Sequence, residues 1–265
     1  MKNIAILFVL ALAIISCSEK QNPQKESEEV TMLKEKIAKF VPVEITYDEV
    51  LLTDREKVVL EKLYRASKII DELFLEQVYI ENYQIKSDLI SKTANKSILE
   101  REPELKPQLE LFNIMFGPFD RLEDNKPFIG KNTKPLGANF YPVDMSKEEF
   151  EKWIKDNPAD EKTFTSEFTI IRRDNGKLGA IPYSEYFKDK LTAASNLLKE
   201  AAEFSDNPSL KKYLLSRANA FLSNDYYQSD MDWMDLKDNN IEVVIGPYEV
   251  YEDAMFNYKA SFESF

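Results

Sequence analysis

The spacing of apolar residues predicts one long amphipathic helix in the first third of the chain. From Thr53 to Val78, apolar residues return every three or four positions, which is the pattern of a helix with one buried face. Thr53 and Glu56 have the spacing of a capping box, in which each side chain accepts a hydrogen bond from the other residue's backbone N–H. We therefore expect the N-terminus of this helix at Thr53.

Three further segments carry helix signals. Ser146 and Glu149 form a second capping box, and the short helix that it opens carries Phe150, Trp153 and Ile154. The segment 186–204 has the pattern of a longer helix. Asn207-Pro208 then provides an N-cap and a first-turn proline for a helix that extends to about Phe221.

Strand signals are fewer. The segments 168–171 and 178–181 flank an Asn175-Gly176 pair, and such a pair permits the positive φ angles of a tight hairpin turn. The segment 241–245 (IEVVI) predicts a short strand that ends at Gly246. The predicted fold class is therefore α+β, a helix-rich lobe with a small antiparallel hairpin or sheet.

Composition excludes several classes of function. The chain has 265 residues, of which 43% are hydrophobic, and this is enough apolar material for a folded core. Its net charge of −12 opposes binding to the phosphates of nucleic acid. It contains no histidine and one cysteine, so a Ser/His/Asp relay, a Cys/His relay and a histidine-ligated zinc site within this chain are all excluded.

The N-terminal residues have the pattern of an export signal. Residues 1–16 combine Lys2 with an unbroken apolar run, and Ile14-Ile15-Ser16-Cys17 resembles a bacterial lipobox, in which the cysteine is acylated after cleavage. Residues 17–30 are mostly polar, which predicts a flexible tether after the acylated cysteine. We expect a lipoprotein of the bacterial cell envelope, held at the membrane through Cys17, with its folded lobe in residues 31–265. An ordinary signal peptide with an incidental cysteine is the alternative.

Two local clusters favour ordinary structural roles. The acidic segment Asp230 to Asp238 lacks the alternating acids, central glycine and closing glutamate of an EF-hand, so we interpret it as a solvated loop. Tyr226, Tyr227, Tyr248, Tyr251 and Tyr258 could form an aromatic platform for a sugar or peptide, although aromatic residues at such spacing more often belong to the core or its rim.

The C-terminal segment carries two linked motifs. Ile245-Gly246-Pro247-Tyr248-Glu249-Val250-Tyr251-Glu252-Asp253 is followed by Phe262-Glu263-Ser264-Phe265. This arrangement resembles the dipeptidyl peptidase III family of zinc metallopeptidases, in which Ile-Gly-x-x-Glu-x-Tyr-x-Asp leads to a Phe-Glu-Gly-Phe-like stretch. Ser264 stands where glycine is usual. The resemblance extends upstream through residues 225–246, the 166–183 hairpin and residues 117–122.

The resemblance implies a two-lobed enzyme that removes dipeptides from peptide N-termini. It assigns Tyr251 as the catalytic donor to the oxyanion, and Glu249 and Asp253 as substrate-binding residues. A neutral phenol can donate a hydrogen bond to charge that develops in the transition state, and a carboxylate can bind a free ammonium. The zinc of the complete family enzyme is held by a His-Glu-x-x-His-type helix and a later glutamate, and no such motif occurs here.

Three hypotheses follow from these observations. The chain is first interpreted as the substrate-binding N-terminal, non-zinc part of a dipeptidyl peptidase III-like peptidase, truncated before the zinc-binding domain and inactive alone. In that case a second chain would carry the zinc lobe. The alternatives are a non-catalytic peptide-binding envelope lipoprotein and a helical envelope scaffold without a ligand. Peptides are the expected ligands in the first two.

The lipobox makes a direct prediction about Cys17. In a bacterial host, the full-length chain should incorporate radioactive palmitate, and Cys17→Ala should abolish the label because it removes the acylated thiol. Persistent labelling of the alanine variant would contradict the predicted lipid attachment.

Overall fold

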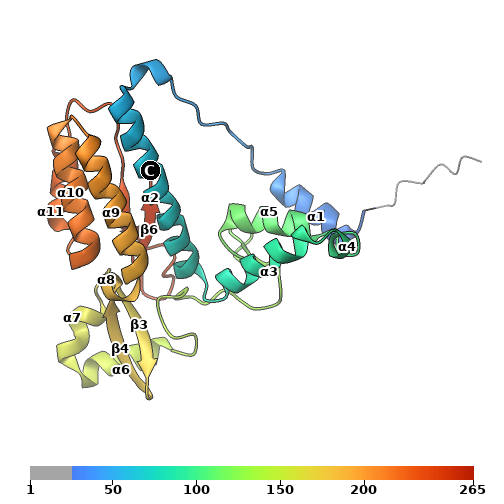
Figure 1. The fold of residues 1–265 in the computed structure, drawn as a ribbon. Helices are drawn as coiled ribbons and strands as arrows, with labels where there is room; N and C mark the ends of the chain where they lie inside the picture. Colours follow the sequence, from blue (N-terminus) through green and yellow to red (C-terminus); the bar gives the residue numbers. More distant parts are fainter. Residues whose placement is uncertain (1–25) are drawn as a thin grey trace, which may run out of the picture.

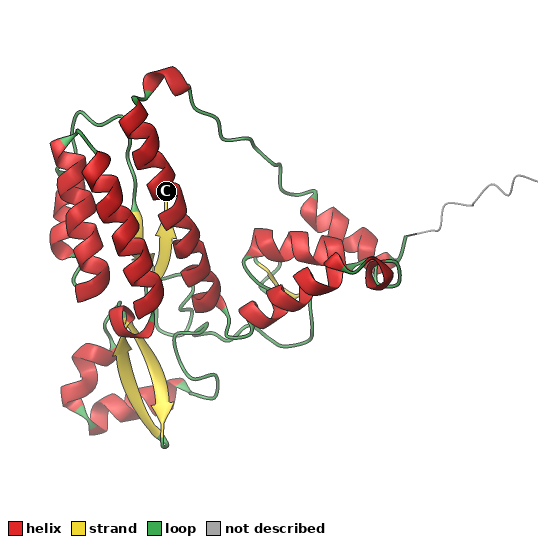
Figure 2. Cartoon of the chain, in the orientation of Figure 1, coloured by secondary structure: helices red, strands yellow, loops and turns green. Residues whose placement is uncertain are grey.

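The computed structural model describes residues 26–265 (Figures 1 and 2). The predicted signal peptide, Cys17 and most of the predicted tether therefore lie outside the described residues. The helices α2, α9, α10 and α11 lie side by side as a bundle, and a lobe containing the β3–β4 hairpin lies at one end of it (Figure 1). A separate group of helices, α1, α3, α4 and α5, lies beyond the other side of α2.

The helices and strands have the following bounds. The helices are α1 (Glu28–Ile37), α2 (Asp54–Val78), α3 (Asn82–Ala94), α4 (Lys96–Leu99), α5 (Leu105–Met115), α6 (Lys147–Asp156), α7 (Glu161–Phe164), α8 (Tyr183–Tyr186), α9 (Lys188–Phe204), α10 (Pro208–Ser223) and α11 (Tyr227–Met234), with short 3-10 turns η1 (Glu49–Leu51) and η2 (Pro158–Asp160). The strands are β1 (Phe119–Asp120), β2 (Lys126–Pro127), β3 (Thr169–Asp174), β4 (Lys177–Pro182), β5 (Ile245–Glu249) and β6 (Ser261–Ser264). They form three two-stranded antiparallel sheets, so the predicted α+β class is confirmed.

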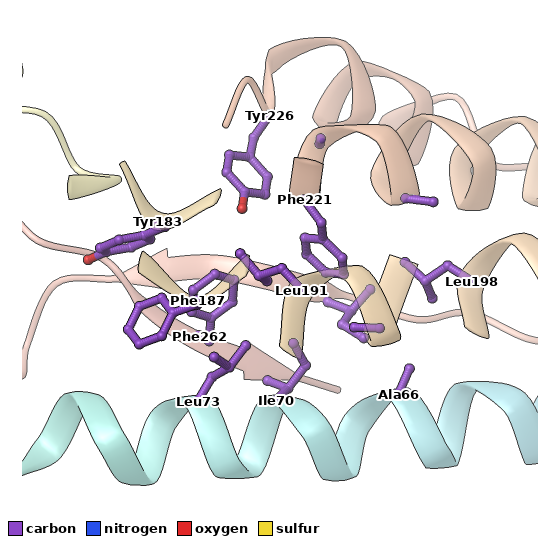
Figure 3. Close-up of a cluster of buried hydrophobic side chains, with 14 of the residues drawn as sticks. Ala66, Ile70, Leu73, Tyr183, Phe187, Leu191, Leu198, Phe221, Tyr226 and Phe262 are labelled. Atoms are coloured by element: carbon purple, nitrogen blue, oxygen red, sulfur yellow. The ribbon is translucent and has the colours of Figure 1, made fainter. Parts of the chain in front are cut away.

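Helix α2 forms one wall of the main core. Thr53 is its N-cap, and both hydrogen bonds of the predicted capping box with Glu56 are present. Its buried face packs against α9 and the strand β6, and Phe262 of β6 lies above α2 on the side of the other helices (Figure 3). The buried residues of α2 in this core are Val59, Leu63, Ala66, Ile70 and Leu73.

The other predicted helices are present with small changes at their ends. Ser146 caps α6, and Asn207 caps α10 by accepting a hydrogen bond from the backbone N–H of Leu210. The segment expected as one helix from residue 186 is divided at Phe187 into α8 and α9. Helix α1 begins at Glu28, so helical structure starts before the expected end of the tether at residue 30.

The N-terminal helices have small cores of their own. Leu33 of α1 packs against α5, and α3 and α5 share a second apolar cluster around Phe112. The buried Lys36 ammonium lies 2.6 Å from the Asp120 carboxylate. This ion pair holds the C-terminal end of α1 against the end of β1. No helix within residues 26–265 combines the length and the apolar character that crossing a membrane would require.

The β3–β4 hairpin is the one predicted from its turn residues. Thr169 pairs with Pro182 and Asp174 with Lys177, so the two strands are joined by Asn175 and Gly176. These two residues have φ angles of 47° and 79°, and an Asn-Gly pair adopts such left-handed values more readily than other residues do.

The predicted strand at residues 241–245 is wrong in position. The observed strand β5 covers Ile245–Glu249 and pairs with β6, whose residues Phe262 and Glu263 face Pro247 and Gly246. Upstream of β5, Val244 exchanges backbone hydrogen bonds with Phe265, and Ile241 and Val243 are buried in the main core without pairing. The apolar alternation in this segment therefore reflects packing against helices.

The C-terminal strand is held inside the fold by polar contacts. The buried side chain of Gln77 on α2 accepts a hydrogen bond from the Phe262 N–H at 2.8 Å and donates one to the Ala260 carbonyl at 3.3 Å. The fully buried Lys259 ammonium donates to the carbonyls of Phe164 and Ser166 and to the Thr169 hydroxyl, at 2.6, 2.8 and 2.7 Å. These contacts join residues far apart in the sequence.

Replacing Lys259 tests this link. Lys259→Met keeps an unbranched apolar side chain but leaves three acceptors without their donor, so we expect the free energy of unfolding to fall by about 3 kcal/mol. Urea denaturation followed by circular dichroism measures this change. Lys188→Met, at an exposed lysine of α9, is the matched control and should leave the unfolding midpoint unchanged. Equal midpoints for the two variants would show that the buried contacts contribute little.

Candidate functional site

Tyr251 is presented to solvent by the turn that follows β5. Its side chain is 79% exposed, whereas the next two residues, Glu252 and Asp253, are 7% and 0% exposed. An exposed phenol directly before two buried acids is unusual, because buried carboxylates require partners. The partners of these acids explain how the Tyr251 turn is held.

Glu252 connects the turn to the segments that follow β1 and β2. Its carboxylate forms ion pairs with Arg121 and with Lys134, the latter at 2.6 Å. Burial raises the pKa of Glu252, but the charges of Arg121 and Lys134 together lower it by more. The pKa of Glu252 therefore lies below its ordinary value. Glu252 is therefore ionised at neutral pH and fixes one side of the turn.

Asp253 holds the other side of the turn. One carboxylate oxygen accepts hydrogen bonds from the N–H groups of Met255 and Phe256, and the other accepts from Tyr258 and Lys259. The Tyr141 hydroxyl donates a further bond of 2.7 Å. Burial and the Asp253 charge raise the pKa of Tyr141 above its ordinary value, so the phenol stays protonated.

This geometry gives Asp253 a role in the loop. The carboxylate has no exposed surface, and all five of its hydrogen-bond donors belong to the protein. As folded here, Asp253 offers no free oxygen to a substrate, which differs from the predicted binding role. It acts on the site by positioning the segment that carries Tyr251.

Glu249 lies at the end of β5 and is exposed, as a substrate-binding residue requires. A bulge between Pro247 and Glu249 shifts the strand register, so that Glu249 faces Ser261. The sequence motifs gave no separate role to Glu263 on β6, which is partly buried. Burial raises the pKa of Glu263, and the nearby Glu249 charge raises it further. Neither carboxylate forms an ion pair with another residue in the described range 26–265.

Strand β5 is held against α10 by the buried Arg217. The guanidinium lies 5.4–5.6 Å from the ring centres of Tyr213, Tyr226 and Tyr248. A Cβ atom at Gly246 would stand 2.7 Å from Arg217 Nη1, and Gly246 has a φ angle of +155°, so only glycine fits this position.

The five tyrosines considered from the sequence do not form a common platform. Tyr226 is buried and Tyr248 half-buried beside Arg217, while Tyr258 stacks on Phe256. Tyr227 and Tyr251 are the exposed members, on separate elements.

A surface hollow of about 220 Å³ lies beside Tyr251. Its other wall is formed by Asp124 and Asn125, between β1 and β2, and by Lys134 in the segment after β2. Glu252, which forms ion pairs with Arg121 and Lys134, also lines this hollow. The ion pairs that hold the Tyr251 turn therefore also shape the hollow beside it.

The acidic segment near residue 230 has partners of its own. Much of it lies in α11, where Asp230 pairs with Arg217 and Asp232 lies 2.8 Å from Lys212. Within the described part of the chain, no group of three or more histidine, cysteine, aspartate or glutamate side chains could hold a metal ion. The residues present therefore do not fit a zinc site of the kind that the resemblance implies for the complete enzyme.

Comparisons with known proteins match this fold. Residues covering 88% of the chain superpose on the solved structure of DPP III from Caldithrix abyssi, with 62% sequence identity and a TM-score of 0.83. The chain resembles part of a dipeptidyl peptidase III. A second solved structure, dipeptidyl-peptidase III from a Corallococcus species (strain EGB), matches 89% of the chain with 42% identity and a TM-score of 0.82.

The match covers only part of each known protein. It accounts for 43% of each of the two solved chains. Among curated proteins, Nudix hydrolase 3 of Arabidopsis thaliana is 34% identical over 283 aligned residues, which represent 88% of this chain and 36% of that protein. No family model matches the chain. The chain thus spans less than half the length of these relatives.

The two roles seen for the 251–253 turn are separable by substitution. Asp253→Asn places an amide N–H₂ where a carboxylate oxygen accepts hydrogen bonds, so we expect it to lower the free energy of unfolding by about 3 kcal/mol. Tyr251→Phe removes only an exposed hydroxyl and should leave stability unchanged. Thermal or urea unfolding measures both. If Asp253→Asn were as stable as the parent chain, Asp253 would not be the residue that organises the loop.

Proposed function

We propose that this chain is the part of a dipeptidyl peptidase III-type enzyme that binds the N-terminal end of a peptide substrate. The observation that carries the proposal is the pair Glu249 and Glu263, two neighbouring carboxylates beside the exposed Tyr251 turn. Their mutual repulsion contributes to the raised pKa of Glu263. The similarity in sequence and structure to two dipeptidyl peptidase III proteins supplies the enzyme class.

A peptide ammonium suits this pair of carboxylates. A cation placed between two acids relieves their repulsion and forms charge-assisted hydrogen bonds, which are stronger than bonds between neutral groups. Glu249 is exposed and can reach an incoming ligand, whereas Glu263 is partly buried on the adjacent strand. The carboxylate pair would thus select peptides with a free N-terminus.

Tyr251 would act on the carbonyl of the bond to be cleaved. Its phenol can donate a hydrogen bond to an oxyanion, and such a donor stabilises charge that is larger in the transition state than in the ground state. The fixed turn contributes by anchoring the backbone directly after Tyr251 through two buried acids, Glu252 and Asp253. Binding of the uncleaved peptide should depend little on this hydroxyl.

Hydrolysis would require groups that this chain lacks. The metal-binding and water-activating residues of such an enzyme would belong to another polypeptide segment, because this sequence has no histidine. We therefore propose that the isolated chain binds peptides without cleaving them. We also propose a location at the bacterial cell envelope, on the basis of the lipobox pattern at Cys17.

Binding of a short peptide tests the ammonium site. Tetra-alanine should bind the purified chain, and its N-acetylated form should bind at least tenfold more weakly because it carries no charge at its N-terminus. Glu249→Gln and Glu263→Gln should each weaken binding of tetra-alanine about tenfold, a loss of about 1.4 kcal/mol. Isothermal titration calorimetry measures these affinities.

Three controls separate this explanation from others. Glu242→Gln, at an exposed acid outside β5, should leave the affinity unchanged, and Tyr251→Phe should bind like the parent chain. Binding should weaken as the pH falls through the raised pKa of Glu263, because protonation removes its charge. Equal affinity for free and acetylated peptide would refute the ammonium site. Zinc-independent release of dipeptides by the purified chain would refute the proposal that cleavage requires residues outside this chain.

A further inference from the structure

The segment between α1 and α2 exposes an unusual amount of apolar surface. We use the name strap for residues 41–47, which run from the N-terminal helices toward the start of α2 (Figure 1). Every second residue of the strap is apolar, and these side chains are between 53% and 96% exposed: Val41, Val43, Ile45 and Tyr47. The alternation is the pattern of a strand with one buried face, yet nothing in the described residues covers that face.

The backbone of the strap is also without partners. Within residues 26–265, no backbone hydrogen bond to or from residues 41–47 is present, although bonds resume at Asp48 and Leu51. Backbone N–H and C=O groups next to apolar side chains are normally paired once those side chains are covered. Covering the strap therefore requires a partner that supplies hydrogen bonds as well as apolar contact, and a β-strand supplies both.

The two edges of the strap differ. In an extended segment, the backbone groups of odd-numbered residues point to one edge and those of even-numbered residues to the other. Pro42 has no N–H and weakens the even-numbered edge. The odd-numbered edge keeps all its donors and acceptors from Val41 to Tyr47, so it is the edge that a partner strand can pair with.

Charge further defines the partner. Glu44 lies on the polar face of the strap, is exposed, and has no ion pair with another residue of the described range. The chain as a whole carries a net charge of −12, which disfavours pairing with a second copy of itself. A strand with apolar residues on one face and lysine or arginine on the other complements the strap.

The similar solved structures indicate where such a strand would come from. More than half of each dipeptidyl peptidase III chain lies outside the part that this chain matches. We propose that the strap pairs with a strand from that remaining part of the fold, apolar on one face and basic on the other, and so forms the interface between the two parts. This inference rests on the proposed function in one respect, because both assign the chain to one part of the same enzyme.

Complementation with a known protein tests the proposal. The probe is the part of the Caldithrix abyssi protein beyond the match, expressed with an affinity tag as a separate polypeptide together with this chain. We expect it to capture this chain, and we expect hydrogen exchange at the backbone amides of Val43, Ile45 and Tyr47 to slow at least tenfold in the complex. In the chain alone, these amides should exchange without protection.

Paired variants locate the contact. Val43→Glu with Ile45→Glu should reduce capture at least tenfold, because it places two charges on the apolar face. Leu222→Glu with Met234→Glu introduces the same charges at exposed apolar positions on the bundle and should leave capture unchanged. Failure of capture by the parent chain, unprotected strap amides in the complex, or equal capture of both double variants would each overturn the proposal.

The ammonium site gives an independent readout. The Val43→Glu, Ile45→Glu variant should bind tetra-alanine with the affinity of the parent chain, since the strap and Glu249 lie on different segments. Protected strap amides in a complex that binds no peptide would refute the proposed function and support the proposed interface. Peptide binding without capture would support the proposed function and refute the proposed interface.

Discussion

The Asp253 carboxylate is the contact on which the candidate site depends. It gathers four backbone N–H groups from the loop between β5 and β6, and the Tyr141 hydroxyl connects that loop to the core. A buried charge is stable only if its hydrogen-bonding capacity is filled, and here the loop fills it by folding around the carboxylate. The exposed Tyr251 and the buried Glu252 occupy fixed places because Asp253 is satisfied in this way.

The same region explains why the C-terminal residues belong to the centre of the fold. The Gln77 side chain on α2 accepts a hydrogen bond from the Phe262 N–H and donates one to the Ala260 carbonyl. Lys259 donates to the Phe164 carbonyl in the lobe that contains β3. Contacts between residues so distant in sequence require long loops to close, which costs conformational entropy. The bundle, the hairpin lobe and the candidate site are thus connected through a few polar side chains surrounded by apolar core.

Local sequence signals predicted the elements that local chemistry controls. The capping box at Thr53 and the turn at Asn175 act within a few residues, and both were found where expected. Helix α3 has no comparable signal, because it buries little besides Asn82 and Leu89 and therefore shows no apolar stripe. The strand expected at 241–245 was misplaced because packing against helices produced the same alternation as strand pairing.

The candidate site shows the same division. Glu249 and Tyr251 were identified through motifs, and both are exposed. The task of Asp253 could not be predicted, because its partner Tyr141 lies 112 residues away. The contribution of Glu263 was likewise not apparent, since its neighbour Glu249 is brought close only by strand pairing.

The fixed ends of the segment between α1 and α2 have a thermodynamic consequence. Lys36 is bonded to the buried Asp120 shortly before this segment, and the Thr53 capping box closes it on the other side. A peptide restrained at both ends samples fewer conformations than a free tail of the same length, so ordering it costs less entropy. The segment has therefore already lost part of its conformational entropy before a partner binds. A short stretch of contact can then suffice for stable association.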